Sequence, residues 1–400
     1  MNYIKHTLAV SISVALTACG GGSSGSSGST GSTGSTAPAS TTTSTTPAST
    51  TSTTPASTTT PVAAARFGYT FDSSNNSLIA YSISSTGALS LKTLVTLPAS
   101  VNPNTFAVDP SGKFGYATIN GGTSGSSGGV IYEYTLGADG SITPMSIPTV
   151  TTGSSPQSIT IDPTSKFAYV ASSDTNTLYE YTIASNGVLT PLSTIALPSN
   201  TNPNVVTIDP AGKNLYVASS APAGGSTASN VSQFSIGSTG SLTSVSTTLS
   251  TTAGSFIYGF AIDASGKYAY LSGAGAVYQY NVSATGALSP MSSPTVAAGT
   301  RPSTLAIDPR GKYVYVSSDS NNVYQFTIGS NGALSPLTSP TVQAAGHPTY
   351  IAVDPTGKFA YVTNSGSHIT SEYSIGANGA LSPLSTATIG SGGDNFITLH

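Results

Sequence analysis

The sequence contains little charge. Of its 400 residues, 11 are Lys or Arg and 14 are Asp or Glu, together 6% of the chain, whereas an average globular domain has about 25%. The net charge is −3, and the basic residues form no cluster along the sequence. A protein that binds nucleic acid needs grouped basic side chains to neutralise the phosphates. We therefore expect no nucleic-acid partner.

Cysteine is almost absent, because Cys19 is the only one. A single cysteine excludes disulfides within the chain. The sequence also lacks a Cys/His spacing for zinc, a phosphate-binding loop, a Gly-x-Ser-x-Gly turn and a calcium-binding loop. These absences lead us to expect neither a metal nor a cofactor.

One phrase, Asp-Pro-x-Gly-Lys-aromatic-x-Tyr, recurs six times with small variations. The first copy is Asp109–Tyr116 and the last is Asp354–Tyr361, and the repeat aspartates between them are Asp162, Asp209, Asp263 and Asp308. A period of about 40 to 50 residues indicates a propeller or a linear array.

Each copy has the pattern of four short strands. In the second copy, two strands flank the turn at Asp162, a third follows at 178–183, and Asn186-Gly187 marks a hairpin. Pro191 in the fourth strand predicts an outer edge strand, because proline has no N–H to donate. No stretch has a helical period, so the sequence predicts an all-β fold.

The two ends of the repeat region complement each other. Residues 66–90 resemble a blade that lacks its first strand, and residues 394–400 resemble that strand alone. Joining them gives a seven-bladed β-propeller of four-stranded blades over residues 66–400, in which the N- and C-terminal strands share one blade. In this closing blade, His400 takes the place of the repeat Asp and Arg66 that of the repeat Lys.

The residues before the propeller have a different character. Residues 1–18 have a basic start and an apolar stretch typical of a signal peptide. Leu16-Thr17-Ala18-Cys19 resembles the lipobox of bacterial lipoproteins, in which the cysteine receives the lipid; the alternative is a plain signal peptide with an incidental cysteine. Residues 19–65 are rich in Gly, Ser, Thr and Pro and are expected to form a disordered tether. We expect a bacterial cell-envelope protein that is anchored to the membrane, the outer one, through lipidated Cys19.

Most charged residues belong to the repeat turns, which leaves few for a site. Residues seven positions before each repeat Asp should lie where the innermost strand begins, close to the central channel. Among them, Arg301 and His347 come from adjacent blades and are the most chemically capable pair. The predicted ligand-binding residues are Asn102, Asn202, Arg301, His347 and Asp394. The alternative is that all of these are ordinary polar loop residues.

The remaining acidic residues fall into two groups. One group is carried by loops that should open on the same face as Arg301: Asp72, Asp174 and Asp319, together with His368 in a loop of the same kind. Glu133, Glu180 and Glu372 recur at one strand position, where other blades have Gln or Ala. We interpret these glutamates as structural residues rather than catalytic acids.

The repeat, its Tyr-x-[Tyr/Phe]-[Thr/Ser]-Ile strand and its Gly-x-Leu-[Ser/Thr]-Pro-Leu ending resemble the β-propeller lactonase family. This family includes 6-phosphogluconolactonase-like proteins, and Tyr361-Val362-Thr363-Asn364 is similar to the YVTN surface-layer repeat. The resemblance implies a lactone hydrolase whose channel is lined by several Arg, His and Glu residues. Here Arg301 and His347 could take such roles, with no glutamate to join them.

Two functions follow from these observations. The preferred one is a non-catalytic envelope lipoprotein whose top face binds a glycan, a peptide or a surface protein. The alternative is an exported lactonase, with His347 as general base and Arg301 stabilising the oxyanion.

Overall fold

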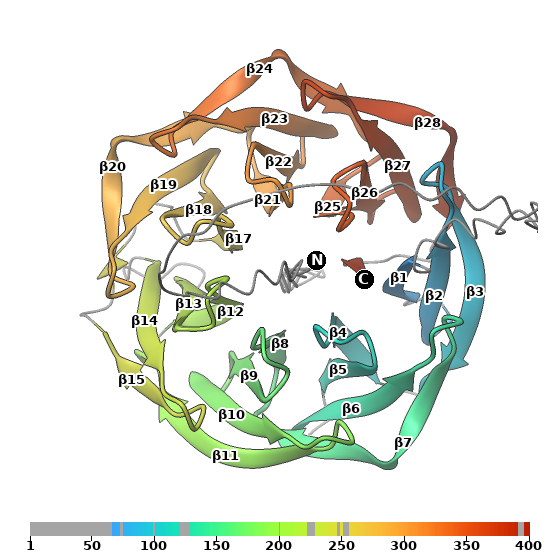
Figure 1. Ribbon diagram of the computed structural model, residues 1–400, viewed down its shortest axis with the longest axis vertical. Helices are drawn as coiled ribbons and strands as arrows, with labels where there is room; N and C mark the ends of the chain where they lie inside the picture. Colours follow the sequence, from blue (N-terminus) through green and yellow to red (C-terminus); the bar gives the residue numbers. More distant parts are fainter. Residues whose placement is uncertain are drawn as a thin grey trace, which may run out of the picture. The chain divides into compact units, whose positions relative to one another are not determined.

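The computed structural model describes residues 66–72, 75–98, 101–120, 128–199, 201–221, 229–245, 249–250, 256–390 and 396–400. These residues form seven antiparallel β-sheets arranged as blades around a central axis (Figure 1). The prediction of an all-β, seven-bladed propeller is confirmed. The predicted signal peptide (1–18), Cys19, the tether (19–65) and Asp394 lie outside the described residues. In the part of the chain that is described, no helix has the length and apolar character to cross a membrane.

The blades are numbered in chain order. Blade 1 contains β1 (Arg66–Asp72), β2 (Ser77–Ile83), β3 (Leu89–Thr96) and β29 (Thr398–Leu399). Blade 2 contains β4 (Asn102–Val108), β5 (Phe114–Asn120), β6 (Gly129–Leu136) and β7 (Ile142–Thr152). Blade 3 contains β8 (Pro156–Ile161), β9 (Phe167–Ser172), β10 (Thr177–Ile183) and β11 (Leu189–Ala196). Blade 4 contains β12 (Asn202–Ile208), β13 (Asn214–Ser220), β14 (Asn230–Ile236), β15 (Leu242–Ser244) and β16 (Leu249–Ser250). Blade 5 contains β17 (Ile257–Ile262), β18 (Tyr268–Gly273), β19 (Ala276–Val282) and β20 (Leu288–Ala297). Blade 6 contains β21 (Pro302–Ile307), β22 (Tyr313–Ser318), β23 (Asn322–Ile328) and β24 (Leu334–Gln343). Blade 7 contains β25 (Pro348–Val353), β26 (Phe359–Asn364), β27 (Ile369–Ile375) and β28 (Leu381–Gly390).

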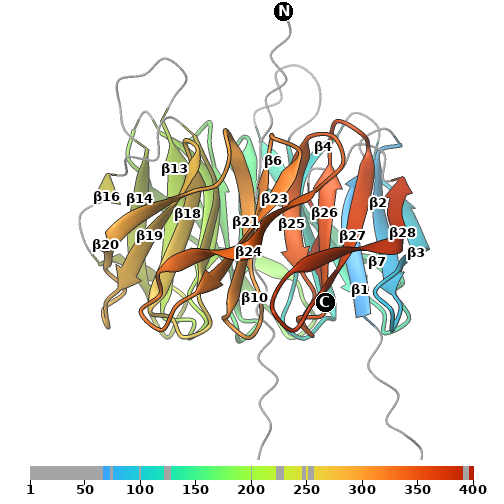
Figure 2. The same cartoon turned by 90° about the horizontal axis from the view of Figure 1, so that it is seen from above.

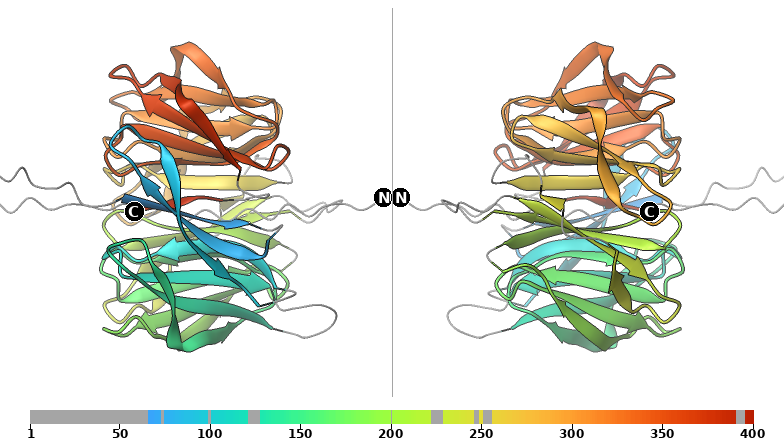
Figure 3. Two further views of the ribbon diagram at one scale, coloured as in Figure 1. Left: turned by 90° about the vertical axis from the view of Figure 1, so that its right-hand side faces the viewer. Right: turned by 90° about the vertical axis from the view of Figure 1, so that its left-hand side faces the viewer.

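Within blades 2 to 7 the strands follow their sequence order from the axis outward. The fourth strand is outermost, as the prolines predicted, and Pro191 lies in β11. In blade 4 this outer position is filled by two short strands, β15 and β16, which both pair with β14. Seen from the side, the sheets stand side by side around the axis (Figure 3).

The repeat turn is held by its buried aspartate. In the first copy, Asp109 Oδ1 accepts the backbone N–H groups of Lys113 at 2.9 Å and Phe114 at 2.8 Å, and Oδ2 accepts the Ser111 hydroxyl at 2.6 Å. Gly112 has a φ of 69°, a left-handed conformation that glycine adopts without strain. The Asp and Gly of the phrase are therefore explained by the turn, which joins the first strand of a blade to the second.

The tyrosine of the phrase connects neighbouring blades. Tyr116 Oη donates to the Gly187 carbonyl of the next blade at 2.7 Å, and Gly187 has a φ of 86°. A Cβ at Gly187 would come within 2.3 Å of the Phe114 ring, so a larger residue does not fit there. The same bond joins five further blade pairs: Tyr169–Gly240, Tyr216–Gly286, Tyr270–Gly332, Tyr315–Gly379 and Tyr361–Gly87.

The glutamates at the recurring strand position also connect blades. Glu133 Oε1 accepts the Leu189 N–H at 2.7 Å, and Glu372 Oε1 accepts the Leu89 N–H at 3.1 Å. Gln233, Gln279 and Gln325 make the equivalent bond with Leu288, Leu334 and Leu381. All three glutamates are buried. Glu133 and Glu372 therefore have a structural role at the blade interfaces, and that the glutamates take no part in catalysis stays a prediction.

Blade 1 is closed by the two ends of the propeller. β29 pairs with β1, with Gly68 opposite Leu399 and Tyr69 opposite Thr398. His400 N–H donates to the Phe67 carbonyl at 2.9 Å, as Asp109 N–H does to Phe114 in the repeat turn. His400 therefore takes the place of the repeat Asp, as predicted. In Figure 1 the C-terminal strand lies beside β1, next to the axis.

Candidate active site

The predicted site residues lie where the innermost strands begin. Asn102 and Asn202 are the first residues of β4 and β12, while Arg301 and His347 immediately precede β21 and β25. This end of each blade is opposite to its repeat turn, because the first and second strands are antiparallel (Figure 2). Asn102 and Asn202 belong to blades 2 and 4, so they are separated along the ring from the pair in blades 6 and 7.

Arg301 and His347 converge on one carboxylate. Asp319, which directly follows β22, lies with Oδ2 3.3 Å from Arg301 Nε and with Oδ1 3.4 Å from His347 Nε2. The Asp319 side chain is 17% exposed, whereas those of Arg301 and His347 are 65% and 40% exposed. The structure thus brings together a guanidinium, a carboxylate and an imidazole at one solvent-accessible place.

The backbone explains this convergence. The N–H of Asp319 donates to the Arg301 carbonyl at 3.1 Å, and the N–H of Ser365 donates to the His347 carbonyl at 3.0 Å. In blades 6 and 7 alike, this bond joins the residue before the first strand to the residue after the second. The same arrangement in blade 3 places the Ser155 hydroxyl 2.8 Å from Asp174 Oδ2. The loops of Asp174 and Asp319 therefore open on the predicted face.

His347 is fixed by both its backbone and its ring. Its N–H donates to Asn321 Oδ1 of blade 6 at 2.9 Å, and its Nδ1 lies 3.1 Å from the Ser365 hydroxyl oxygen. Its φ of 60° is uncommon for a residue other than glycine. Ser155, at the equivalent position of blade 3, has a φ of 53°. Blades 3 and 7 thus share this conformation, and at blade 7 the residue that adopts it carries an imidazole.

Arg301 also contacts blade 5. Its Nη2 lies 3.5 Å from the Tyr258 hydroxyl, and the hydrogen bond to Tyr258, together with the charge of Asp319, raises the pKa of Arg301 further. Arg301 therefore remains a cation while its charge is largely balanced by Asp319. The cluster of Tyr258, Arg301, Asp319, His347 and Ser365 spans blades 5, 6 and 7, and we call it the site cluster.

These groups suit hydrolysis of an ester-like bond. An imidazole can take a proton from water near neutral pH, and a guanidinium can stabilise a developing oxyanion. Within the described ranges, no three His, Cys, Asp or Glu side chains are grouped closely enough to hold a metal ion.

A feature that the sequence reasoning missed is a β-bulge in the innermost strands. The register shifts between Ile257 and Gly259 in β17, which leaves Tyr258 as the extra residue, and equivalent shifts occur in β4, β8, β12, β21 and β25. Bulges redirect side chains and are frequent next to functional sites. The place of the bulge could have been read from the repeat, because the bulged residue always lies five positions before the repeat Asp. Asp319 was expected on this face, but its contact with both Arg301 and His347 was not.

The fold is a seven-bladed β-propeller, and the site cluster brings a guanidinium, a carboxylate and an imidazole together at one end of it. Residues 115–257 and 264–395 match the family model described as a lactonase, 7-bladed beta-propeller. This match covers more than half of the chain, so the protein belongs to the seven-bladed β-propeller lactonase family.

Solved structures agree on the fold. A putative 6-phosphogluconolactonase from Bacteroides fragilis is 18% identical with a TM-score of 0.72, and the match covers 85% of this chain and 99% of that one. A putative 6-phosphogluconolactonase from Bacteroides uniformis has 18% identity and a TM-score of 0.73, with 84% and 99% covered. A periplasmic gluconolactonase from Pseudomonas aeruginosa has 15% identity and a TM-score of 0.69, with 84% and 98% covered. None of the curated proteins matches this chain.

These findings correct one expectation. The sequence analysis preferred a non-catalytic binding protein because few acid–base groups remained outside the repeat turns. The family match contradicts that preference and supports the lactonase alternative. The count of available groups was misleading because it paired Arg301 with His347 but left out Asp319, which the fold places in contact with both.

Proposed function

We propose that this protein is a lactone hydrolase whose reaction takes place at the site cluster. The observation that supports this most strongly is the convergence of Arg301 and His347 on Asp319, in a chain of the lactonase family. His347 acts as general base, Arg301 stabilises the oxyanion and Asp319 positions both.

The chemistry requires a water molecule next to the imidazole. At 3.4 Å, His347 Nε2 and Asp319 Oδ1 leave no room for a water molecule between them, so the water approaches the imidazole, which is 40% exposed, from the solvent side. His347 removes a proton as the water oxygen bonds to the lactone carbonyl carbon, and the carbonyl oxygen becomes an anion beside Arg301. The ring C–O bond then breaks, the ring oxygen takes the proton from His347, and a hydroxy acid is released.

The test is steady-state hydrolysis of glucono-1,5-lactone by purified protein, corrected for spontaneous hydrolysis. His347→Ala should lower kcat by about 10²- to 10⁴-fold, the range of general base catalysis. Arg301→Ala should lower kcat by about 10²- to 10³-fold, as the loss of an oxyanion donor does. Leu94→Ala, at an exposed residue of the outer strand β3, is the control and should keep wild-type activity. Equal activity of wild type and both site variants would contradict the proposal.

We also propose that the enzyme is exported and held at the bacterial cell envelope by lipid on Cys19. The support is the position of the single cysteine after an apolar leader with a lipobox-like sequence. Lipid at this position would place lactone hydrolysis outside the cytoplasm.

A further inference from the structure

An exposed aromatic pair lies next to the site cluster. The rings of Phe256 and Tyr258 are stacked, with centroids 5.9 Å apart and planes 9° apart. Phe256 is 46% exposed, an unusual degree for a phenylalanine in this protein, whose other described phenylalanines are largely buried. Through its hydroxyl, Tyr258 contacts Arg301 at 3.5 Å. The pair therefore continues the site cluster into blade 5.

Blade 5 departs from its own repeat at this place. The three residues that lead into the innermost strand are a polar or charged residue, a proline and a polar residue in five blades: Asn102-Pro103-Asn104, Ser155-Pro156-Gln157, Asn202-Pro203-Asn204, Arg301-Pro302-Ser303 and His347-Pro348-Thr349. Blade 5 has Phe256-Ile257-Tyr258 instead. The fold does not require aromatic residues here, because the same bulge forms in the other five blades without them. The exception occurs in the blade next to Arg301.

The charge at this end of the ring restricts the substrate. Among the described residues, the Lys and Arg side chains other than Arg301 lie on the repeat turns, on β3 or, for Arg66, at the start of β1, where it is paired with Asp354. Arg301 is already paired with Asp319. Asp72 is the last residue of β1, and Asp174 lies just after β9. Both are therefore at the same end of the ring as Asp319. A phosphate monoester carries close to two negative charges and needs unbalanced cations for binding. This end of the propeller offers no such surplus.

We infer that Phe256 and Tyr258 form a stacking surface for the substrate ring, and that the substrate is an uncharged lactone rather than a phosphorylated one. The C–H face of a sugar-derived lactone packs on Phe256, because aromatic rings supply a large apolar contact area. Stacking there holds the lactone carbonyl toward Arg301. This inference rests on the proposed function, since it names the substrate class of the same site.

The kinetic test compares glucono-1,5-lactone with its 6-phosphate. Wild type should have a kcat/KM at least about tenfold higher for the uncharged lactone. Phe256→Ala should raise KM for that lactone about tenfold with little change in kcat, because stacking contributes equally to substrate and transition state. Ile147→Ala removes an apolar side chain that is 60% exposed on β7, and it should leave both constants unchanged.

A binding test separates this inference from the catalytic proposal. The protein contains no tryptophan, so Phe256→Trp introduces a single tryptophan at the stacking surface, whose emission can be excited apart from that of the tyrosines. Saturable fluorescence change on titration with glucono-1,5-lactam, a stable analogue, is the expected result. The same titration of Leu94→Trp, on the outer strand β3, should show no change.

The outcomes are distinguishable. If wild type hydrolyses the lactone but Phe256→Ala has an unchanged KM, the stacking surface is wrong and the proposed function stands. If no lactone is hydrolysed but the lactam saturates the Phe256→Trp signal, the catalytic proposal fails and the binding surface stands. A preference for the 6-phosphate, or no response in either test, overturns the inference.

Discussion

Glu133 illustrates how a single residue can be structural and still sensitive to pH. Its Oε1 accepts the Leu189 N–H, but Oε2 has no hydrogen-bond partner among the described residues. Burial raises the pKa of Glu133, and the Leu189 N–H opposes this only in part. In blade 5, Gln279 makes the same inter-blade bond and also donates from Nε2 to the Ser293 carbonyl at 2.8 Å. A glutamine side chain thus uses both its oxygen and its N–H group in hydrogen bonds at this position, whereas an ionised Glu133 leaves one oxygen without a partner in the described part of the chain.

We expect Glu133→Gln to stabilise the propeller at alkaline pH. The folded-state pKa of Glu133 lies above that of the unfolded chain. The contribution of Glu133 to folding stability is therefore fully present below the unfolded pKa. It is lost as pH rises through the folded pKa. The variant should gain about 1 kcal/mol of unfolding free energy at pH 8, the cost of a buried unpaired polar group, and less at pH 5.

Urea denaturation followed by circular dichroism at both pH values measures this effect. The matched control is the reverse change in blade 5, Gln279→Glu, which should introduce the same pH dependence where none existed. A difference between Glu133→Gln and wild type that is the same at pH 5 and pH 8 would show that ionisation is not involved.

At the scale of elements, β29, a strand of only two residues, closes the ring. β29 covers the inner edge of β1, Thr398 donates to the Phe106 carbonyl at 2.7 Å, and Thr70 donates to the Phe396 carbonyl at 2.6 Å. Phe396 is 2% exposed and packs edge-to-face on Phe71 with centroids 5.0 Å apart. These contacts join residues that are about 300 positions apart in the sequence.

Phe396→Ala should therefore destabilise the whole propeller. Removing a buried phenylalanine side chain costs about 3 to 5 kcal/mol, because apolar contact is lost and a cavity remains. Leu91→Ala, at a side chain that is 64% exposed on β3, should change stability by less than about 0.5 kcal/mol. The urea midpoints of the two variants test this, and similar midpoints would mean that the closing strand contributes little.

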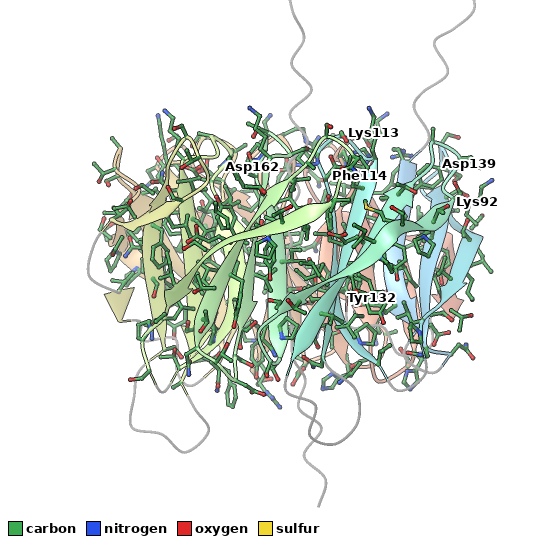
Figure 4. The ribbon with its side chains drawn as sticks, turned by 90° about the horizontal axis from the view of Figure 1, so that it is seen from below. Lys92, Lys113, Phe114, Tyr132, Asp139 and Asp162 are labelled. Carbon is green, nitrogen blue, oxygen red and sulfur yellow. The ribbon has the colours of Figure 1, made fainter. Side chains whose placement is uncertain are left out.

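Across the whole molecule, the fold gathers at one end of the ring the repeat lysines, which are spread along the sequence. The six repeat lysines, Lys113, Lys166, Lys213, Lys267, Lys312 and Lys358, are all exposed, and each follows a buried repeat aspartate. Because every repeat turn lies at the same end of its blade, these lysines gather at the end of the ring opposite to the site cluster. Figure 4 shows Lys113 at that end, with Lys92 and Asp139 near it and Tyr132 farther along the blade. The proposed active site is thus at the end of the propeller without the repeat lysines.

The location of the molecule is tested through its single cysteine. If lipid on Cys19 holds the protein at the envelope, Cys19→Ser should move it from the membrane fraction to the soluble fraction. The physical reason is that several acyl chains bind a bilayer stably, whereas the polar tether and propeller offer no comparable apolar anchor. Membrane fractionation and the intact mass of the mature protein measure this. Wild-type protein found in the soluble fraction without added lipid mass would contradict the anchor.

The sequence by itself determined the number of blades, their strand order and the closure of the ring. Each of these depends on local signals, namely the Asp turn, the Asn-Gly hairpin and proline in an outer strand, and these signals recur among the repeats, whose aspartates are 45 to 54 residues apart. The tertiary structure decided the site. Asp319 contacts both Arg301 and His347 only because blades 6 and 7 pack against each other. Tyr258 reaches Arg301 from the β-bulge in β17, a shift of strand register that the residue types of the strand do not reveal. Spacing along a chain cannot specify distances across a blade interface, because these arise from how the sheets pack around the axis.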